Sequence, residues 1–124
     1  MPSTIASCHC GGTRIELPVA PASATRCTCT FCTKSGGLWA YYEVDAPRIL
    51  SDTHGAVYSP TSPLHAHHFC ARCGCTTYGT SPDYSLDDVE VPEKMKLAVN
   101  VRLLDDYELY RALPVEEIDG RNLW

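Results

Sequence analysis

The sequence predicts a mainly β fold, an all-β sandwich or folded sheet that forms one domain over residues 1–124. Many of its apolar stretches are short and alternate with polar residues, as half-buried strands do. Proline and glycine separate these stretches, and neither an internal repeat nor an alternation of strands with helices is visible. A length of 124 residues is enough for one domain with a core of its own.

Four strands are expected in the first half of the chain. Thr13–Leu17 alternates polar and apolar residues and stops at a proline. Leu38–Val44 is rich in aromatic residues, which favour strands. Two short strands, Arg48–Leu50 and Ala56–Tyr58, are expected on either side of a turn at Asp52–Gly55.

The second half contains the clearest strand, Lys94–Leu103, because five apolar side chains share one parity and predict a core face: Met95, Leu97, Val99, Val101 and Leu103. A strand is also expected at Thr76–Tyr78, and the polar, proline-containing stretch Ser81–Glu93 is expected to be a loop. Asp105–Leu113 predicts one short helix capped by its first residue. Val115–Ile118 is expected as a last short strand.

Composition and charge exclude several classes of protein. With 44% apolar and 20% charged residues, the chain is not expected to be disordered. A formal net charge of -5 argues against nucleic acid as a partner, because binding to phosphates needs a basic face. No apolar run is long enough to span a membrane, and the N-terminus lacks the features of a signal peptide. We therefore expect a cytoplasmic protein without a membrane partner, whose oligomeric state the sequence leaves open.

Cysteine is the chemically informative residue, since eight are present in three clusters. In a reducing cytoplasm their C-x-C and C-x2-C spacings favour metal ligation, with disulfides as the alternative. One pair early in the chain and one pair late in it would together close a four-sulfur zinc site, which is structural because no position is free for a substrate. These predicted ligands are Cys8, Cys10, Cys70 and Cys73.

Three further thiols fall within six residues, namely Cys27, Cys29 and Cys32. In an extended segment the first two point to one side, and a tight turn through Thr30 and Phe31 would bring the third to the same point. Three sulfurs leave a fourth position of a zinc ion for water or a substrate, so we expect the catalytic centre here. Lys34, and with it Arg26, would attract an anionic substrate.

Several alternatives stay open at this point. Cys75 is left over as a spare thiol, a replacement ligand or a small buried hydrophobe. Alternatively it completes the three-thiol set, which would make the protein a zinc-stabilised module without catalysis. Such a module would bind a protein partner through an exposed apolar patch near Trp39, Tyr41 and Tyr42. Three histidines beside the last cysteine cluster would offer a base or a ligand, or form a solvated strand edge: His65, His67 and His68.

The cysteine clusters and their surroundings resemble the glutathione-dependent formaldehyde-activating enzyme family, which includes the centromere protein V domain. The stretches that carry the resemblance are Ser7–Gly11, Cys27–Cys32 with Lys34 and Gly36, and His68–Gly74. Val99–Asp105 and Val115–Trp124 resemble the centromere protein V side of the family. Two departures from the family pattern are Thr30, where serine is common, and Cys75, where threonine is common.

The resemblance implies an Mss4-like fold, with antiparallel sheets built around zinc, as in small Rab-binding proteins. It implies a structural zinc ion on the four-cysteine set and a second, labile zinc ion on Cys27, Cys29 and Cys32. It also implies carbon–sulfur lyase chemistry, in which glutathione adds to formaldehyde to give S-hydroxymethylglutathione, or the reverse. Zinc would act as a Lewis acid, and Lys34 would hold the carboxylates of the small-thiol substrate.

Overall fold

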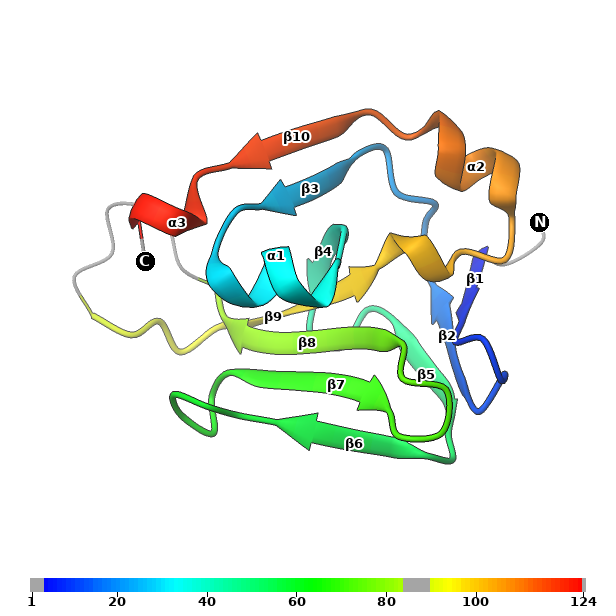
Figure 1. Cartoon of the computed structure of the whole chain (residues 1–124), viewed down its shortest axis with the longest axis horizontal. Helices are drawn as coiled ribbons and strands as arrows, with labels where there is room; N and C mark the ends of the chain where they lie inside the picture. Colours follow the sequence, from blue (N-terminus) through cyan, green and yellow to red (C-terminus); the bar gives the residue numbers. More distant parts are fainter. Residues whose placement is uncertain (1–3, 84–89, 124) are drawn as a thin grey trace.

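The computed structural model describes residues 4–83 and 90–123, and Figure 1 shows the elements in chain order. Its strands are β1 (Thr4–Ser7), β2 (Thr13–Leu17), β3 (Ala24–Cys27), β4 (Trp39–Glu43), β5 (Arg48–Asp52), β6 (Gly55–Tyr58), β7 (Ala66–Cys70), β8 (Thr76–Pro82), β9 (Met95–Asn100) and β10 (Val115–Ile118). The helical segments are α1 (Thr30–Ser35), the 3-10 turn η1 (Val101–Leu103), α2 (Tyr107–Ala112) and α3 (Gly120–Leu123).

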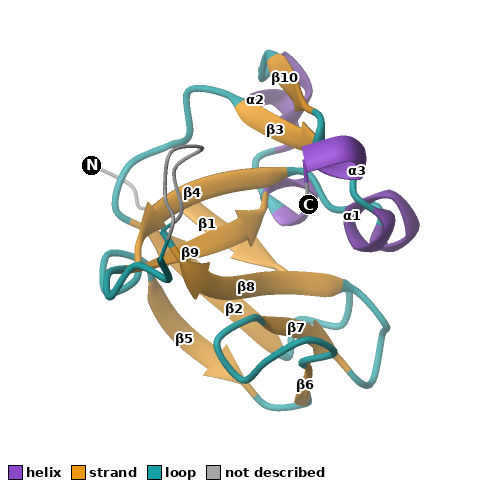
Figure 2. Ribbon diagram, turned by 90° about the vertical axis from the view of Figure 1, so that its left-hand side faces the viewer, coloured by secondary structure: helices purple, strands orange, loops and turns teal. Residues whose placement is uncertain are grey.

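The strands form two sheets, one small and one large. The small sheet has the order β1-β2-β5, and the large one has the order β10-β3-β4-β9-β8-β7-β6. Every pair of neighbours is antiparallel except β10 and β3, which run in parallel. Figure 2 shows how strongly the large sheet curves between its two ends. This arrangement confirms the predicted fold class, a mainly β chain of antiparallel sheets.

The core lies where the two sheets meet. Leu97 and Val99 of β9 are buried, as their shared parity predicted, and they pack with Ile15 of the small sheet. An isolated bridge between Ala6 and Leu104 joins β1 to the chain that follows η1. Burial of each such aliphatic side chain contributes about 1.5–3 kcal/mol, so this seam is a main source of stability.

The expected strands of the first half are present within two residues of their predicted ends, whereas other segments differ from expectation. β8 runs on to Pro82, so the loop expected from Ser81 begins later, and its residues 84–89 lie outside the described part of the chain. β1, β3 and β7 were not expected as strands. The histidines of β7 hide its pattern, because their rings are half-buried against aromatic neighbours.

The long strand predicted from Lys94 to Leu103 is wrong after Asn100. The Asn100 side chain accepts from the backbone N–H of Leu38 (3.3 Å) and of Arg102 (3.2 Å), and donates to the carbonyl of Thr76 (2.9 Å). These bonds turn the chain into η1 and connect β9 to the segments that lead into β4 and β8. The prediction failed because a strand pattern shows parity but not such long-range hydrogen bonds.

The predicted helix cap is also displaced by one residue. Asp106 caps α2, accepting from the backbone N–H of Leu109 (3.1 Å). Asp105 instead accepts from the hydroxyl of Ser7 (3.1 Å), and its own N–H donates to the carbonyl of Ile5 (2.9 Å). Both aspartates could cap on propensity alone, and the contact with β1 decides between them.

Candidate active site and metal centres

The first cluster brings together the four sulfurs predicted as a closed set. Cys8, Cys10, Cys70 and Cys73 have their Sγ atoms within 4.8 Å of one another. Cys8 and Cys10 lie in the turn that joins β1 to β2, whereas Cys70 ends β7 and Cys73 lies in the turn between β7 and β8. Gly11 (φ 81°) and Gly74 (φ 82°) adopt the left-handed conformation that each of these tight turns requires. The cluster therefore connects the two sheets at their corners.

The spacing of these sulfurs fits zinc. The Sγ atom of Cys10 lies 3.7 Å from that of Cys8 and 3.6 Å from that of Cys70. In a tetrahedral site with Zn–S bonds of about 2.3 Å, sulfurs lie about 3.8 Å apart. A disulfide would place them about 2.05 Å apart, and all eight cysteines are free. The structure thus offers no support for the disulfide alternative.

Backbone donors surround this cluster and favour thiolates. The N–H of Thr13 donates to the Sγ of Cys8 (3.3 Å). The backbone N–H groups of Cys75 and Cys10 lower the pKa of the Cys73 thiol to about 5. Thiolate sulfur is the form that ligates metal, so this donor set suits a cation held by four protein sulfurs.

Cys75 lies beside this first cluster rather than beside the three-cysteine set. Burial raises the pKa of its thiol, and the neighbouring thiols of Cys73 and Cys8 raise it further. Among the described residues, the group around Cys27 contains three ligand atoms and does not include Cys75. The alternative of two closed four-cysteine sites therefore finds no support in the structure.

The second cluster contains Cys27, Cys29 and Cys32, whose sulfurs also lie within 4.8 Å of one another. Cys27 ends β3 and is buried, whereas Cys29 and Cys32 are partly exposed. The expected tight turn at Thr30 and Phe31 is instead the first turn of α1. Cys29 caps this helix, because its Sγ accepts from the backbone N–H of Cys32 (3.3 Å). One ligand thus starts the helix that positions the next.

The protein environment favours a negative charge on Cys29. Burial opposes ionisation, but the backbone N–H groups of Cys32 and Phe31 and the neighbouring thiols outweigh it and lower the pKa of Cys29. For Cys32 the balance is reversed, since burial and the thiols of Cys29 and Cys27 raise its pKa. The three sulfurs therefore form a compact group in which a cation would be needed to hold all of them as thiolates.

Trp39 supplies a buried donor next to this cluster. Its indole Nε1–H has no hydrogen-bond partner of good geometry among the described residues, although the side chain is only 5% exposed. The indole nevertheless approaches Cys32 closely enough to oppose the rise in that thiol's pKa. Gly37 makes room for the ring, because a Cβ at that position would collide with the indole. A buried N–H without an oxygen or nitrogen acceptor suits a neighbouring metal-bound sulfur.

The burial of Trp39 removes the main member of the expected protein-binding patch. Tyr42 is also engaged, since its hydroxyl donates to the carbonyl of Val19 (3.1 Å). Tyr41 is 44% exposed, but desolvation of its hydroxyl end and the nearby charges of the three-cysteine set raise its pKa to about 12. Tyr41 therefore keeps its proton near the cluster, and it is a candidate site residue that sequence reasoning assigned to the patch.

Two basic residues were expected beside the cluster, and the structure separates them. Lys34 is exposed in the last turn of α1, on the helix face that also carries Phe31. Arg26 and Cys27 are successive residues of a strand and point to opposite faces of the sheet. The Arg26 guanidinium pairs with Glu117 of β10 (3.9 Å). Arg26 is thus directed away from the cluster, whereas Lys34 is exposed on the helix that carries Cys32.

The segment after β10 holds the backbone between the first two ligands. Arg121 donates from Nε to the carbonyl of Thr28 (2.9 Å) and from Nη2 to the hydroxyl of Thr33 (3.3 Å). The N–H of Thr28 donates to the carbonyl of Ile118 (3.1 Å). Sequence reasoning missed Arg121, because it lies about 90 residues from its partners and no spacing motif connects them.

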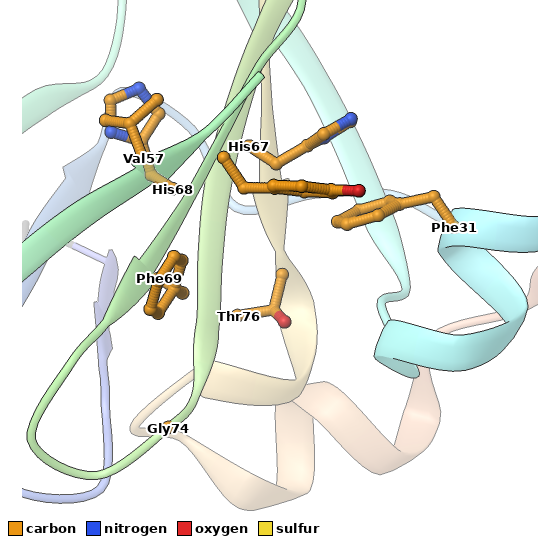
Figure 3. A pocket seen from close by; sticks show the side chains of 8 residues that line it. Phe31, Val57, His67, His68, Phe69, Gly74 and Thr76 are labelled. Carbon is orange, nitrogen blue, oxygen red and sulfur yellow. The ribbon is translucent and has the colours of Figure 1, made fainter. Parts of the chain in front are cut away.

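A cavity of about 340 Å³ opens beside α1 and is bounded by β6, β7 and the turn into β8. Figure 3 shows Phe31 projecting from α1 toward His67. Their rings stack with centroids 3.7 Å apart, which places the half-buried His67 at the wall of the cavity. Burial lowers the pKa of His67, with His65 and His68 contributing, so its ring is neutral near pH 7. None of these three histidines belongs to a group of potential metal ligands in the described ranges.

A comparison with models of protein families shows which family the chain belongs to. A model described as glutathione-dependent formaldehyde-activating enzyme matches residues 3–113, which include both cysteine clusters. The chain belongs to this family. Its cysteine clusters fit the metal sites that the resemblance implied, while zinc ligation by the individual residues stays a prediction.

The fold of this family member is also found among solved structures. A crystal structure of a Rhodobacter sphaeroides protein is 26% identical, with a TM-score of 0.65, and the similarity covers 90% of this chain and 99% of that one. A search of curated proteins gives no match. In the described part of the chain, no helix is long and apolar enough to cross a membrane.

Proposed function

We propose that the protein is a cytoplasmic, zinc-dependent carbon–sulfur lyase that acts on adducts of a small thiol, such as glutathione, with an aldehyde. The observation that carries this proposal is the three-sulfur cluster, which Cys75 does not complete and which is partly exposed. The description of the family, which names glutathione and formaldehyde, supports a thiol and an aldehyde as the reacting partners.

Each cysteine cluster has its own part in this proposal. Cys8, Cys10, Cys70 and Cys73 would hold a structural zinc ion, and Cys27, Cys29 and Cys32 would hold a labile one. When bound by three protein sulfurs, zinc supplies a Lewis acid that lowers the pKa of a thiol or water in its fourth position. The indole of Trp39 would stabilise the charge on Cys32.

The residues around the cluster bind the substrate and move its protons. The ammonium group of Lys34 attracts the carboxylates of the thiol at the exposed face of α1. When the C–S bond of the adduct breaks, the hydroxyl proton leaves as the carbonyl forms, and the sulfur recovers a proton as the thiol departs. A ring nitrogen of neutral His67 is available at the cavity wall to accept the hydroxyl proton.

Replacement of Cys29 tests the proposal. In metal-replete Cys29→Ser we expect one of two zinc ions to be lost, the fold to be kept, and turnover of S-hydroxymethylglutathione to fall at least about 100-fold. Metal content, circular dichroism and formaldehyde release are measured on the same sample. Loss of one ion with unchanged turnover would show that this cluster is not catalytic.

A further inference from the structure

The cavity beside α1 is lined by side chains that do not match a charged ligand. None of its lining residues is Lys, Arg, Asp or Glu, and the aromatic and aliphatic ones include Phe31, Val57, Tyr58 and Phe69. Burial lowers the pKa of His67, whose ring stacks on Phe31, and keeps it neutral near pH 7. An ionic group placed here would lose part of its hydration without gaining a charged partner. The chemistry of the lining therefore favours an apolar occupant.

The shape of the cavity favours a flat occupant. The Phe31 ring stacks on His67, and the Tyr58 ring lies 6.3 Å from Phe31 at an angle of 27°. At the same place Val57 and Tyr58 are 56% and 52% exposed, which leaves apolar surface in contact with water. A ring inserted against these residues would cover that surface and stack as aromatic pairs do.

The size of the cavity exceeds what a formaldehyde adduct needs. A volume of about 340 Å³ is roughly ten times the share of one molecule in liquid water, about 30 Å³, whereas a hydroxymethyl group contains only two heavy atoms. The glutathione part cannot fill the remainder, because its charged ends find no partner in this lining. Lys34, on the exposed face of α1, is the group that suits those ends.

The cavity lies next to the proposed reaction centre. Phe31 lines the cavity and stands between Cys29 and Cys32 in sequence, so its backbone lies within one helical turn of theirs on α1. A substituent on the carbon that is bonded to the substrate's sulfur would extend from the three-cysteine cluster into this space.

We infer that this protein prefers thiol adducts of aldehydes with an apolar, ring-sized substituent over the adduct of formaldehyde, and that the cavity lined by Phe31, Val57 and Tyr58 binds this substituent. The inference rests on the proposed function and gives its substrate class. The reaction stays balanced: R–CH(OH)–S–R′ splits into R–CHO and R′–SH as the hydroxyl proton is removed and the sulfur is protonated, without an oxidant or reductant.

Two stable thioethers test this preference without turnover. S-benzylglutathione and S-methylglutathione differ only in the group that the cavity would bind, and their Kd values for the metal-loaded protein are measured by calorimetry. We expect the benzyl compound to bind at least about tenfold more tightly, because its ring leaves water for an apolar site. In Phe31→Ala we expect the ratio to fall below about threefold, with binding of the methyl compound unchanged. Tyr107→Ala, at an exposed aromatic position on α2, is the matched control and should keep the wild-type ratio.

The outcomes separate this inference from the proposed function. Equal binding of the two thioethers to the wild-type protein would overturn the inference and leave the lyase proposal standing. If neither binds, both fail. Val57→Thr, on the exposed strand β6, changes polarity with little change of volume and covers the case in which Phe31→Ala does not fold. A preference for the benzyl compound that survives in both variants would place the ring elsewhere and overturn the inference.

Discussion

The two clusters are both built from cysteine, but they differ in the number of sulfurs and in how far apart these lie in the sequence. The four-cysteine cluster joins segments that are 60 residues apart in sequence, and two of its members, Cys8 and Cys70, are almost fully buried while Cys10 and Cys73 are partly exposed. The three-cysteine cluster lies within a single stretch between β3 and α1, and two of its members are partly exposed. Sulfurs that close a long loop stabilise the fold, because the bound ion restricts the unfolded chain. Sulfurs that share one local segment contribute less to the fold, and a set of three leaves the fourth position of a bound ion to a ligand.

The largest expected effect comes from breaking the closed cluster. Cys70→Ser should lose the structural zinc ion and several kcal/mol of folding free energy, enough to prevent native folding at 25 °C. Circular dichroism and metal content report the loss. The control is Cys75→Ser, at a position two residues after the predicted ligand Cys73. This variant should keep both ions and change the free energy of unfolding by less than about 1 kcal/mol. If Cys70→Ser folds as well as Cys75→Ser, the closed cluster has no structural role.

A smaller effect is expected from the donor beside the open cluster. Trp39→Phe keeps an aromatic ring in the core but removes the Nε1–H that approaches Cys32. We expect the labile ion to bind about tenfold more weakly, because outer hydrogen-bond partners typically change metal affinity by 10–100-fold. Competition with a chromophoric chelator measures this affinity, and binding of the structural ion should not change. Tyr42→Phe, which removes only the bond to Val19, is the control; an equal loss in both variants would exclude a specific role of the indole.

The smallest effect is expected from the exposed cation on α1. Lys34→Gln should raise KM for a glutathione adduct about threefold to tenfold and leave kcat within a factor of two, because the charge attracts the substrate but does not touch the reacting atoms. The difference from the wild-type protein should shrink at high salt. Lys94→Gln changes a comparable surface lysine, paired with Glu43, and should leave KM unaltered. A fall in kcat alone would assign Lys34 a different role.

The sequence predicted the two clusters because their ligand spacings are local. A C-x2-C turn followed by glycine can adopt few conformations. In the structure Gly74 adopts the left-handed conformation that such a turn requires. Most strands were also predictable, since burial of one face imposes parity on residues such as Leu97 and Val99. The position of Cys75 became clear only in three dimensions, because the sequence left open whether it completes the three-thiol set, and the structure places it beside the four-cysteine cluster.

The supporting residues of the site could not be predicted. Arg121 and Trp39 act through contacts between segments that are distant in sequence. The residues next to them in the chain do not indicate that either lies beside the three-cysteine cluster. The helix α1 was missed because Thr30–Ser35 contains mostly weak helix formers. It forms through the Cys29 cap and through Gly36, which ends it in the left-handed conformation (φ 74°).

The accessibility of the two metal sites is the central claim, and timed chelation of the metal-replete protein tests it most directly. We predict that a strong chelator removes one zinc ion within minutes while the circular dichroism spectrum stays native, and that added glutathione slows this release by occupying the fourth position. The other ion should leave only when the protein unfolds. Release of both ions in a single phase, or retention of both in the folded protein, would contradict the distinction between an open and a closed cluster.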